Sequence, residues 1–561
     1  MIGNETKVFR LFLLAFLLLS SLFACKDLFG PLDNPVDRES ENYQGYDTIL
    51  NADDIKIFYP ANSRIAGSQT TFIVSEVRGA SAYQIQISSS QSDFENNILL
   101  KNSDYASNKI DIGLQSLTRG IWYYWRARAQ QSGEWGKWTE ISSFIIGYTI
   151  TYNGNGNTEG SVPIDSNIYL EGESAIVAKR SGSLIKAGYG FDSWNTRSDG
   201  TGINLRAGST LVVSQENITL YAIWHLLSLW AIGCNNYGQL CDGTTTNRYI
   251  PIEVMEDVKA VAAGEEHTMI LKNDGSLWAV GRNSEGQLGD GETNRRPTPI
   301  KVMDDVQAVS VGRYHTMILK NDGRLFATGD NFYSQLCDGT NITRYIPIEV
   351  MEDVKAVAAG WTQTMILKND GSSWAAGMGW DDMDYNGAGY GPMKPIKVMD
   401  DVKEIEPGQD SYSMILKNDG SLWGRGGNYH GQLGDGTTHD RSSPVKVMDN
   451  VKAVAAGFEH TMILKNDSSL WATGSNEYGQ LGDGTTHDRS SPVKVMDDVK
   501  AVAIGAYFTM ILKNDSSLWA TGSNEYGQLG DGTTTTRYLP IKIIEDVEDI
   551  KAGYDYALIL K

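Results

Sequence analysis

Histidines recur at one position of a repeating pattern in the C-terminal half of the chain. His267, His315 and His460 each follow a glycine by three residues. Imidazole side chains that converged on one axis could bind a metal ion or transfer protons. The equivalent position in the other copies of the pattern holds Gln363, Tyr412, Phe508 and Tyr556. The ring of imidazoles is therefore broken, and we expect these histidines to be polar caps on a loop.

A second candidate site lies where the fourth copy of the pattern departs from the others. In the stretch GMGWDDMDYNG, Asp382, Asp384 and Asn386 fit the first half of an oxygen-rich calcium loop. Tyr390 and Met393 stand where further carboxylates would be needed. Two interpretations stay open, a calcium site and a solvated acidic loop, and the incomplete ligand set favours the second. We expect no other cofactor.

The third candidate site consists of loop residues that vary between copies while their surroundings do not. Aromatic and arginine side chains exposed on a rigid scaffold are typical of interface hot spots. An alternative is that about half of them pack against neighbouring loops. The candidate ligand-binding residues are Arg313, Tyr314, Trp361, Phe458, Tyr507 and Tyr554.

Motifs and charge both argue against common chemistries. The chain has no G-x-S-x-G, no H-E-x-x-H and no paired-cysteine metal spacing, so we expect a binding protein and not an enzyme. Its formal net charge is −21 and its pI about 4.8, which would repel a phosphate backbone. We therefore expect no nucleic-acid partner.

The positions of these candidates are set by a repeat of about 48 residues. An aromatic anchor begins one strand of each copy, and a glycine ends another. Units this small cannot bury an apolar face alone, so they predict a closed ring of blades, a β-propeller. The anchors are Trp230, Trp278, Phe326, Trp374, Trp423, Trp471 and Trp519, and the glycines are Gly264, Gly312, Gly360, Gly408, Gly457, Gly505 and Gly553.

Each copy predicts four strands. The first two strands are KAVAAG and HTMILK, which the variable loop joins. A hairpin turn at NDG leads to the third strand, SLWAxG, and the outermost strand is PIKVM. We expect the anchor tryptophans to face the neighbouring blade as core residues. The array begins in mid-unit at LLSLWAIG and ends at IKAGYDYALILK, so the terminal strands should share one blade.

The motifs GQLGDGT and AGxxHT closely resemble those of the regulator of chromosome condensation repeat family. The resemblance covers residues 226–561 and implies a seven-bladed propeller. Known members include a nucleotide-exchange factor for a nuclear GTPase, a plant ultraviolet photoreceptor and a secreted bacterial inhibitor of β-lactamases. Guanine-nucleotide exchange needs a nuclear partner, which an exported protein does not meet.

The N-terminus predicts export. Residues 1–25 carry Lys7 and Arg10 before an apolar run that ends in LFAC, which resembles the bacterial lipobox. We expect Cys25 to be lipidated, and the alternative is an ordinary signal peptide with a chance cysteine. Residues 26–54 are polar and acidic and read as a tether.

Two small β modules are expected between the tether and the propeller. Residues 55–147 contain the alternating strand WYYWRARA and resemble a fibronectin type III sandwich. Residues 148–225 contain GYGFDSWNTRSDGTG and ITLYAIW and resemble the internalin-type, or Listeria-Bacteroides, β-grasp repeat of bacterial surface proteins.

Together these patterns predict an all-β, lipid-anchored protein of the bacterial cell envelope, at the outer membrane or the cell surface. Its propeller is expected to bind a protein or glycan there. The alternative function is inhibition of an extracytoplasmic enzyme such as a β-lactamase. Cys234 and Cys241 share one loop, and whether they pair stays open.

Overall fold

The computed structural model describes residues 55–67, 69–100, 104–178, 184–378, 394–408 and 412–561. These residues form strands and turns, with one 3-10 turn, η2 (Glu95–Asn97). Within these ranges no helix is long and apolar enough to span a membrane. The chain divides into two compact units, one of 1–156, 160–184 and 192–223 and one of 157–159, 185–191 and 224–561.

The first unit begins with two sheets that enclose one apolar core. Trp125 and Phe72 meet edge to face there at 4.6 Å between ring centroids. The sheets consist of β1 (Ile57–Tyr59), β3 (Gln69–Val74) and β6 (Lys109–Gly113), and of β2 (Ser63–Ile65), β9 (Ser142–Ile146), β7 (Trp122–Gln131), β4 (Ala80–Ser88) and β5 (Ile98–Leu100), with β8 (Glu134–Trp135) paired to β7.

Strand β7 alternates as its sequence predicts. Tyr123, Trp125, Ala127 and Ala129 are buried, while the residues between them are at least partly exposed. Such alternation is what a strand with one face on a core requires. The two packed sheets agree with a β-sandwich, and the assignment to the fibronectin type III type stays a prediction.

The next module is built around Trp194. This side chain is fully buried, and its ring lies 4.7 Å from that of Tyr152. One sheet orders β10 (Ile150–Asn153), β15 (Ile218–Leu226), β12 (Tyr189–Asn195) and β13 (Asn204–Leu205), with β10 parallel to β15, and a second pairs β11 (Ser174–Ile176) with β14 (Thr210–Val212).

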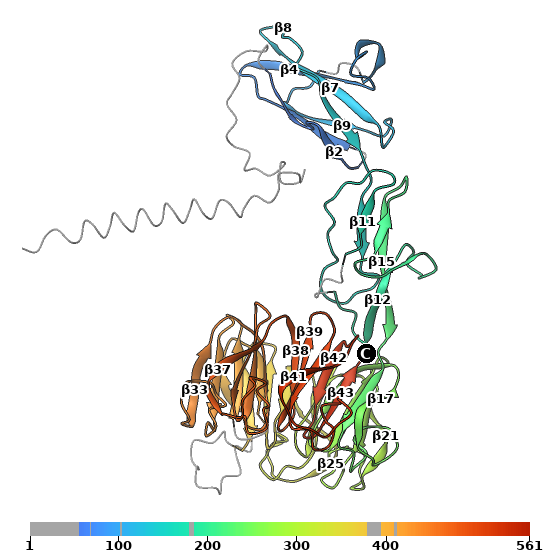
Figure 1. Ribbon diagram of the computed structural model, residues 1–561. Coiled ribbons are helices and arrows are strands. Elements are labelled where there is room, and N and C mark those ends of the chain that lie inside the picture. Colours follow the sequence, from blue (N-terminus) through green and yellow to red (C-terminus); the bar gives the residue numbers. More distant parts are fainter. Residues whose placement is uncertain (1–54, 68, 101–103, 179–183, 379–393, 409–411) are drawn as a thin grey trace, which may run out of the picture. The chain divides into compact units, whose positions relative to one another are not determined.

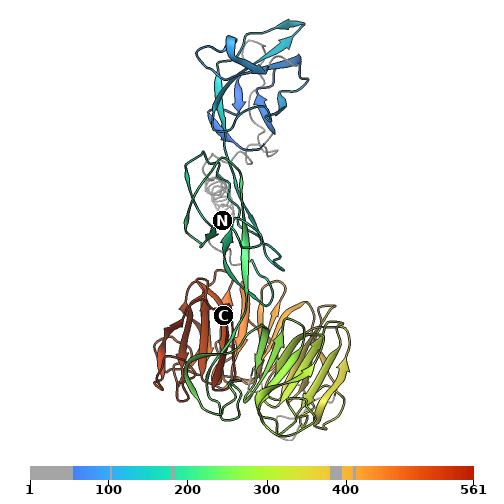
Figure 2. The same ribbon diagram turned by 90° about the vertical axis from the view of Figure 1, so that its right-hand side faces the viewer.

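The described part of residues 229–560 forms seven four-stranded antiparallel sheets (Figures 1 and 2). The innermost strands, which carry the KAVAAG pattern, line a central channel. They are β18 (Val258–Ala263), β22 (Val306–Val311), β26 (Val354–Ala359), β30 (Val402–Pro407), β34 (Val451–Ala456), β38 (Val499–Ile504) and β42 (Asp549–Ala552).

The second strands carry the HTMILK pattern and are buried along most of their length. They are β19 (His267–Lys272), β23 (His315–Lys320), β27 (Gln363–Lys368), β31 (Tyr412–Lys417), β35 (His460–Lys465), β39 (Phe508–Lys513) and β43 (Tyr556–Leu560).

The third strands carry the aromatic anchors as their second residues, and the fourth form the outer edges of the sheets. The third are β16 (Leu229–Gly233), β20 (Leu277–Gly281), β24 (Leu325–Gly329), β28 (Ser373–Gly377), β32 (Leu422–Gly426), β36 (Leu470–Gly474) and β40 (Leu518–Gly522). The fourth are β17 (Arg248–Met255), β21 (Arg296–Met303), β25 (Arg344–Met351), β29 (Ile396–Met399), β33 (Arg441–Met448), β37 (Arg489–Met496) and β41 (Arg537–Ile544).

One sheet joins the two ends of the array, as predicted. Its order is β17-β16-β43-β42, and β16 pairs with β43 from Leu229 opposite Leu560 to Gly233 opposite Tyr556. Figure 1 shows the red strand β43 beside the green strands of this sheet. The side chains of β43 are buried in the cores on both sides. The first and last strands of the array therefore close the ring.

The anchor tryptophans face the neighbouring sheet, but they are not fully buried. Trp278 packs against the core of the closing sheet and Trp471 against a core that contains Tyr412. Both are half-buried, and their indole nitrogens donate to Ser276 and Ser469 at 2.9 and 3.0 Å. The prediction that they are core residues therefore holds only in part: each packs against an apolar core but stays partly exposed.

Candidate functional site

The loops between the first and second strands of the sheets gather at one end of the channel, because the strands of every sheet run in the same order. We call this end the glycine-loop mouth. It consists of residues 264–266, 312–314, 360–362, 457–459, 505–507 and 553–555.

Glycine begins each loop because neighbouring sheets touch there. A β-carbon on Gly312 would lie 2.3 Å from the carbonyl oxygen of Gly360 and 2.2 Å from His315 Cε1. One on Gly553 would lie 2.6 Å from the carbonyl oxygen of Gly264, across the closure of the ring. These contacts are too short for any side chain, so the glycines hold the loops close together.

Four aromatic residues of the mouth form one cluster across sheets. The ring of Phe458 lies 4.8 Å from Trp361, 5.7 Å from Tyr507 and 6.5 Å from Tyr554. Tyr507 and Tyr554 are 6.4 Å apart. Edge-to-face pairs at these distances are favourable, and all four side chains remain half-buried.

Arginine 313 extends the cluster toward Tyr314. Its guanidinium carbon lies 4.3 Å from the centroid of Trp361 and 4.7 Å from that of Tyr314, and its Nε is ion-paired with Glu265. The structure thus brings the six predicted binding residues together in one surface.

The prediction that the loop aromatic side chains are accessible to solvent, whereas those of Trp278 and Trp471 are not, is wrong. Both groups of side chains are half-buried.

The mouth also carries an excess of carboxyl groups. Burial raises the pKa of Glu265, although its ion pair with Arg313 opposes this. Burial, with the charges of Glu525, Glu265 and Glu266, raises the pKa of Asp555 to about 7. Binding of a positively charged group at this surface would therefore be favoured.

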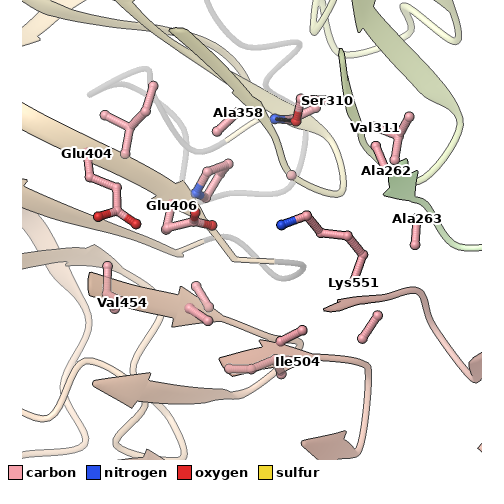
Figure 3. Close-up of a pocket in the computed structure, with 18 of the residues that line it drawn as sticks. Ala262, Ala263, Ser310, Val311, Ala358, Glu404, Glu406, Val454, Ile504 and Lys551 are labelled. Atoms are coloured by element: carbon pink, nitrogen blue, oxygen red, sulfur yellow. Dashed lines mark hydrogen bonds between the residues drawn. The ribbon is translucent and has the colours of Figure 1, made fainter. Parts of the chain in front are cut away.

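Below the mouth, the innermost strands enclose a cavity of about 570 Å³. Alanine fills most of the positions two and four residues before the loop glycines, which leaves the centre of the ring open. Glu404, Glu406 and Lys551 replace alanine and project into this space (Figure 3). Sequence reasoning missed them, although VKEIEPG and VEDIKAG stand out once aligned with VKAVAAG.

The histidines occupy a different environment from the one predicted. His267, His315 and His460 begin second strands and are fully buried, and each Nε2 hydrogen-bonds a threonine of the next sheet, at 3.1, 2.9 and 3.2 Å. Burial lowers the pKa of all three to about 3. They are buried links between sheets, and the prediction of polar caps on a loop is wrong.

The GQLGDGT loops are held by a repeated polar network. In one copy, Asn476 Nδ2 donates to Asp483 Oδ1 at 3.0 Å, and Arg489 is ion-paired with the same aspartate at 2.6 Å. The Leu481 amide donates to Asn476 Oδ1 at 3.0 Å. Because the partners of this aspartate lie within its own loop, the motif fixes the shape of the loop.

The remaining predicted sites can be placed only in part. Cys25, Asp382, Asp384 and Asn386 lie outside the described residues. In the described ranges no three His, Cys, Asp or Glu side chains are grouped as metal ligands. Cys234 and Cys241 are buried and unpaired.

Comparison with protein families identifies both kinds of repeat. Residues 228–271, 274–319, 322–367, 419–464, 467–512 and 515–560 match the Regulator of chromosome condensation (RCC1) repeat. A second model of the same repeat matches 258–287, 306–335, 451–480 and 499–528. Residues 148–223 match the Listeria-Bacteroides repeat domain. The first model thus leaves out residues 368–418, where the fourth copy departs from the pattern.

Solved structures share the propeller fold. Human WBSCR16 is 20% identical, with a TM-score of 0.54, over 60% of this chain and 99% of its own. Prp20p from Saccharomyces cerevisiae is 19% identical with the same TM-score, over 60% of this chain and 91% of its own, and its structure is described with its binding properties to Gsp1p and histones. A further crystal structure holds Kap60 bound to yeast RCC1 (Prp20).

Two curated proteins of Evansella cellulosilytica match a shorter stretch. One, named as a Gly-rich membrane protein, is 34% identical over 79 residues, and one named as a membrane protein is 32% identical over 80 residues. Each match covers 14% of this chain, and the chain spans only 9% and 12% of these relatives.

Proposed function

Since the chain belongs to the regulator of chromosome condensation repeat family, whose propellers are mainly protein-binding scaffolds, we propose that it is a non-catalytic binding protein whose glycine-loop mouth contacts a protein partner. A glycan is the other partner expected from the sequence. We further propose that the protein is exported and lipid-anchored at Cys25, at the outer membrane or the cell surface.

One observation carries the choice of surface. Arg313, Trp361, Phe458, Tyr507 and Tyr554 come from separate sheets, yet they form one contiguous, half-exposed cluster. Aromatic and arginine side chains clustered on a preorganised surface supply most of the binding energy of protein interfaces. The yeast relative, whose binding to Gsp1p and histones is described, supports a protein partner for this fold.

The alternative is an inhibitor of an extracytoplasmic enzyme such as a β-lactamase. It would use the same mouth, because a rigid rim of aromatic side chains also suits a tight enzyme–inhibitor contact. Guanine-nucleotide exchange is a third, weaker candidate, since the proposed export would keep the protein from a nuclear partner. The identity of a captured partner separates these functions.

The test compares Trp361→Ala with Trp471→Ala in the full chain. Both tryptophans are half-buried, but Trp361 lies in the mouth and Trp471 between sheets. Trp361→Ala should cost about 1 kcal/mol of stability and at least ~2 kcal/mol of binding, which is about 30-fold in Kd. Trp471→Ala should cost about 3 kcal/mol of stability while the folded protein keeps its affinity.

The measurements are thermal melting and affinity for a partner captured from an envelope extract. A partner that is held by the wild type and by Trp471→Ala but lost by Trp361→Ala supports the mouth. Equal retention by both variants would place the binding surface elsewhere. If Trp361→Ala melts as early as Trp471→Ala, the mouth cluster is structural.

A further inference from the structure

In the channel below the glycine-loop mouth, carboxyl groups outnumber ammonium groups. At the positions two and four residues before the loop glycines, three side chains are acidic and one is basic. The acids are Glu404, Glu406 and Asp549, and the base is Lys551. Lys551 Nζ is already 3.5 Å from Asp549 Oδ2 on its own strand. The same ammonium also interacts with Glu406 and Glu404, so one cation is shared by three carboxyl groups.

Of the two glutamates, Glu406 has fewer polar contacts than Glu404. Its side chain is half-buried and lines the cavity (Figure 3). In the described part of the chain no group hydrogen-bonds this carboxyl or pairs with it within 4.0 Å. Glu404, in contrast, receives a backbone hydrogen bond from Val454. An unpartnered acid that points into an open cavity is costly unless a ligand pairs with it.

The two ends of the channel differ in charge. At the far end, Lys403 Nζ donates to the Lys452 carbonyl at 2.8 Å. Lys500 Nζ donates to the Glu548 carbonyl at 3.0 Å and pairs with the Glu548 carboxylate at 3.3 Å, so ammonium groups border that end and one of them is balanced. The mouth instead offers acidic groups and aromatic faces. One of these faces, that of Trp361, already accepts a cation, the guanidinium of Arg313, at 4.3 Å. A cation would therefore enter from the mouth.

We propose that the channel binds an alkylammonium group that passes the aromatic cluster and pairs with Glu406. Glu406 lies two residues before Gly408, about 7 Å below the mouth along the strand, within the span of a lysine's four-carbon stem. The group is either the side chain of a lysine on the protein partner or the amine of a free aliphatic polyamine. This inference rests on the proposed function, because it assigns the ligand chemistry of the same mouth.

The experiment measures calorimetric binding of three probes to the full chain: n-butylamine, a short lysine-containing peptide and spermidine. Glu406→Ala should weaken binding at least about tenfold, as expected for a lost charge-assisted hydrogen bond. The variant should fold, because alanine occupies this position in other sheets, as at Ala358 and Ala455. Glu253→Gln, an exposed acid on β17, is the matched control and should bind as the wild type does.

A second variant tests the charge balance. Lys551→Ala removes the competing ammonium, and it should tighten the binding of all three probes. Spermidine that binds more than tenfold better than the peptide identifies a polyamine site, and the reverse identifies a lysine side chain. Either result supports the proposal.

The proposal is overturned if no probe binds, if Glu406→Ala binds as the wild type does, or if 5-aminopentanoate binds better than n-butylamine. The last result would mean that Lys551 dominates and recognises an anion. These probes need no protein partner, so their failure would leave the capture experiment with Trp361→Ala unaffected. Conversely, the partner could bind Trp361→Ala as well as it binds the wild type while amine binding still requires Glu406. That pair of results would disprove only the docking surface.

Discussion

At the scale of single residues, the repeat is a set of contacts made from one sheet to the next. The histidine of one sheet reaches the threonine of its neighbour, as His315 Nε2 does to Thr364 Oγ1 at 2.9 Å. Where the histidine is replaced, other groups make the link: Gln363 Nε2 donates to the Tyr412 carbonyl at 2.9 Å. Position, more than residue type, is therefore what the fold requires here.

The buried histidines make stability depend on pH. An unfolded histidine has a pKa of about 6.5, whereas that of His460 in the fold is about 3. Below pH 6.5 the unfolded chain therefore binds a proton that the folded chain does not. Stability is complete above that pH and falls as pH drops toward 3, by about 2 kcal/mol per histidine at pH 5.

His460→Gln isolates this effect, because glutamine already occupies the equivalent position at Gln363. We expect the loss of unfolding free energy between pH 7 and pH 5, measured by urea denaturation, to be about 2 kcal/mol smaller in the variant than in the wild type. Asp555 and Glu406, whose pKa values are raised to about 7 and about 8, act in the opposite direction. They are present in both proteins and cancel. Equal pH dependence in the two proteins would contradict the assignment.

At the scale of elements, one strand decides whether the ring closes. β43 lies between β16 and β42, and its five side chains are fully buried. Tyr556, Leu558 and Leu560 belong to one core, and Ala557 and Ile559 to the next. Each of the other six propeller sheets consists of four consecutive strands, so this sheet alone depends on a contact between the ends of the array.

Deletion of residues 555–561 should therefore open the ring. Each large apolar side chain of β43 contributes about 1.5–3 kcal/mol, so the loss approaches the whole stability of a typical domain. The unpaired edge of β16 should then promote aggregation. Size-exclusion chromatography and thermal melting measure both effects. Leu560→Ala, which leaves the strand paired, is the control and should stay monomeric while losing about 2–5 kcal/mol. A soluble, monomeric truncation with the wild-type Tm would refute the closure.

At the scale of the whole molecule, the sequence combines a proposed anchor and tether with two small β modules and a propeller. A single acyl chain gives only marginal membrane binding, so a stable anchor requires several chains on one cysteine. Lipidation of Cys25 is the proposed route to the envelope because the sequence LFAC resembles a lipobox, and it would have to supply more than one acyl chain.

Cys25→Ala should abolish labelling by a radioactive fatty acid and move the protein from the detergent phase to the aqueous phase, because about 0.8 kcal/mol per buried methylene is lost. Cys234→Ala serves as the control, since Cys234 is a buried, unpaired thiol and its removal should leave labelling unchanged. Unaltered detergent partitioning of Cys25→Ala would contradict the anchor.

The sequence by itself determined the propeller, the strands of each repeat and the sharing of one sheet by the two ends. It could do so because a period near 48 residues, alternating apolar positions and the truncated first and last units are all local patterns. It also predicted the Listeria-Bacteroides module and the loops that form the mouth.

Only the tertiary structure decided which of these residues meet. Trp361 and Phe458 stand two repeats apart in the sequence, and that spacing does not show that their side chains touch. The burial of the histidines was likewise missed, because a neighbouring sheet covers them. Glu404 and Glu406 could be recognised as a site only once the structure placed the seven innermost strands around one channel. Replacement of alanine by glutamate is ordinary on an exposed surface. Inside this channel it leaves a carboxyl group without a partner.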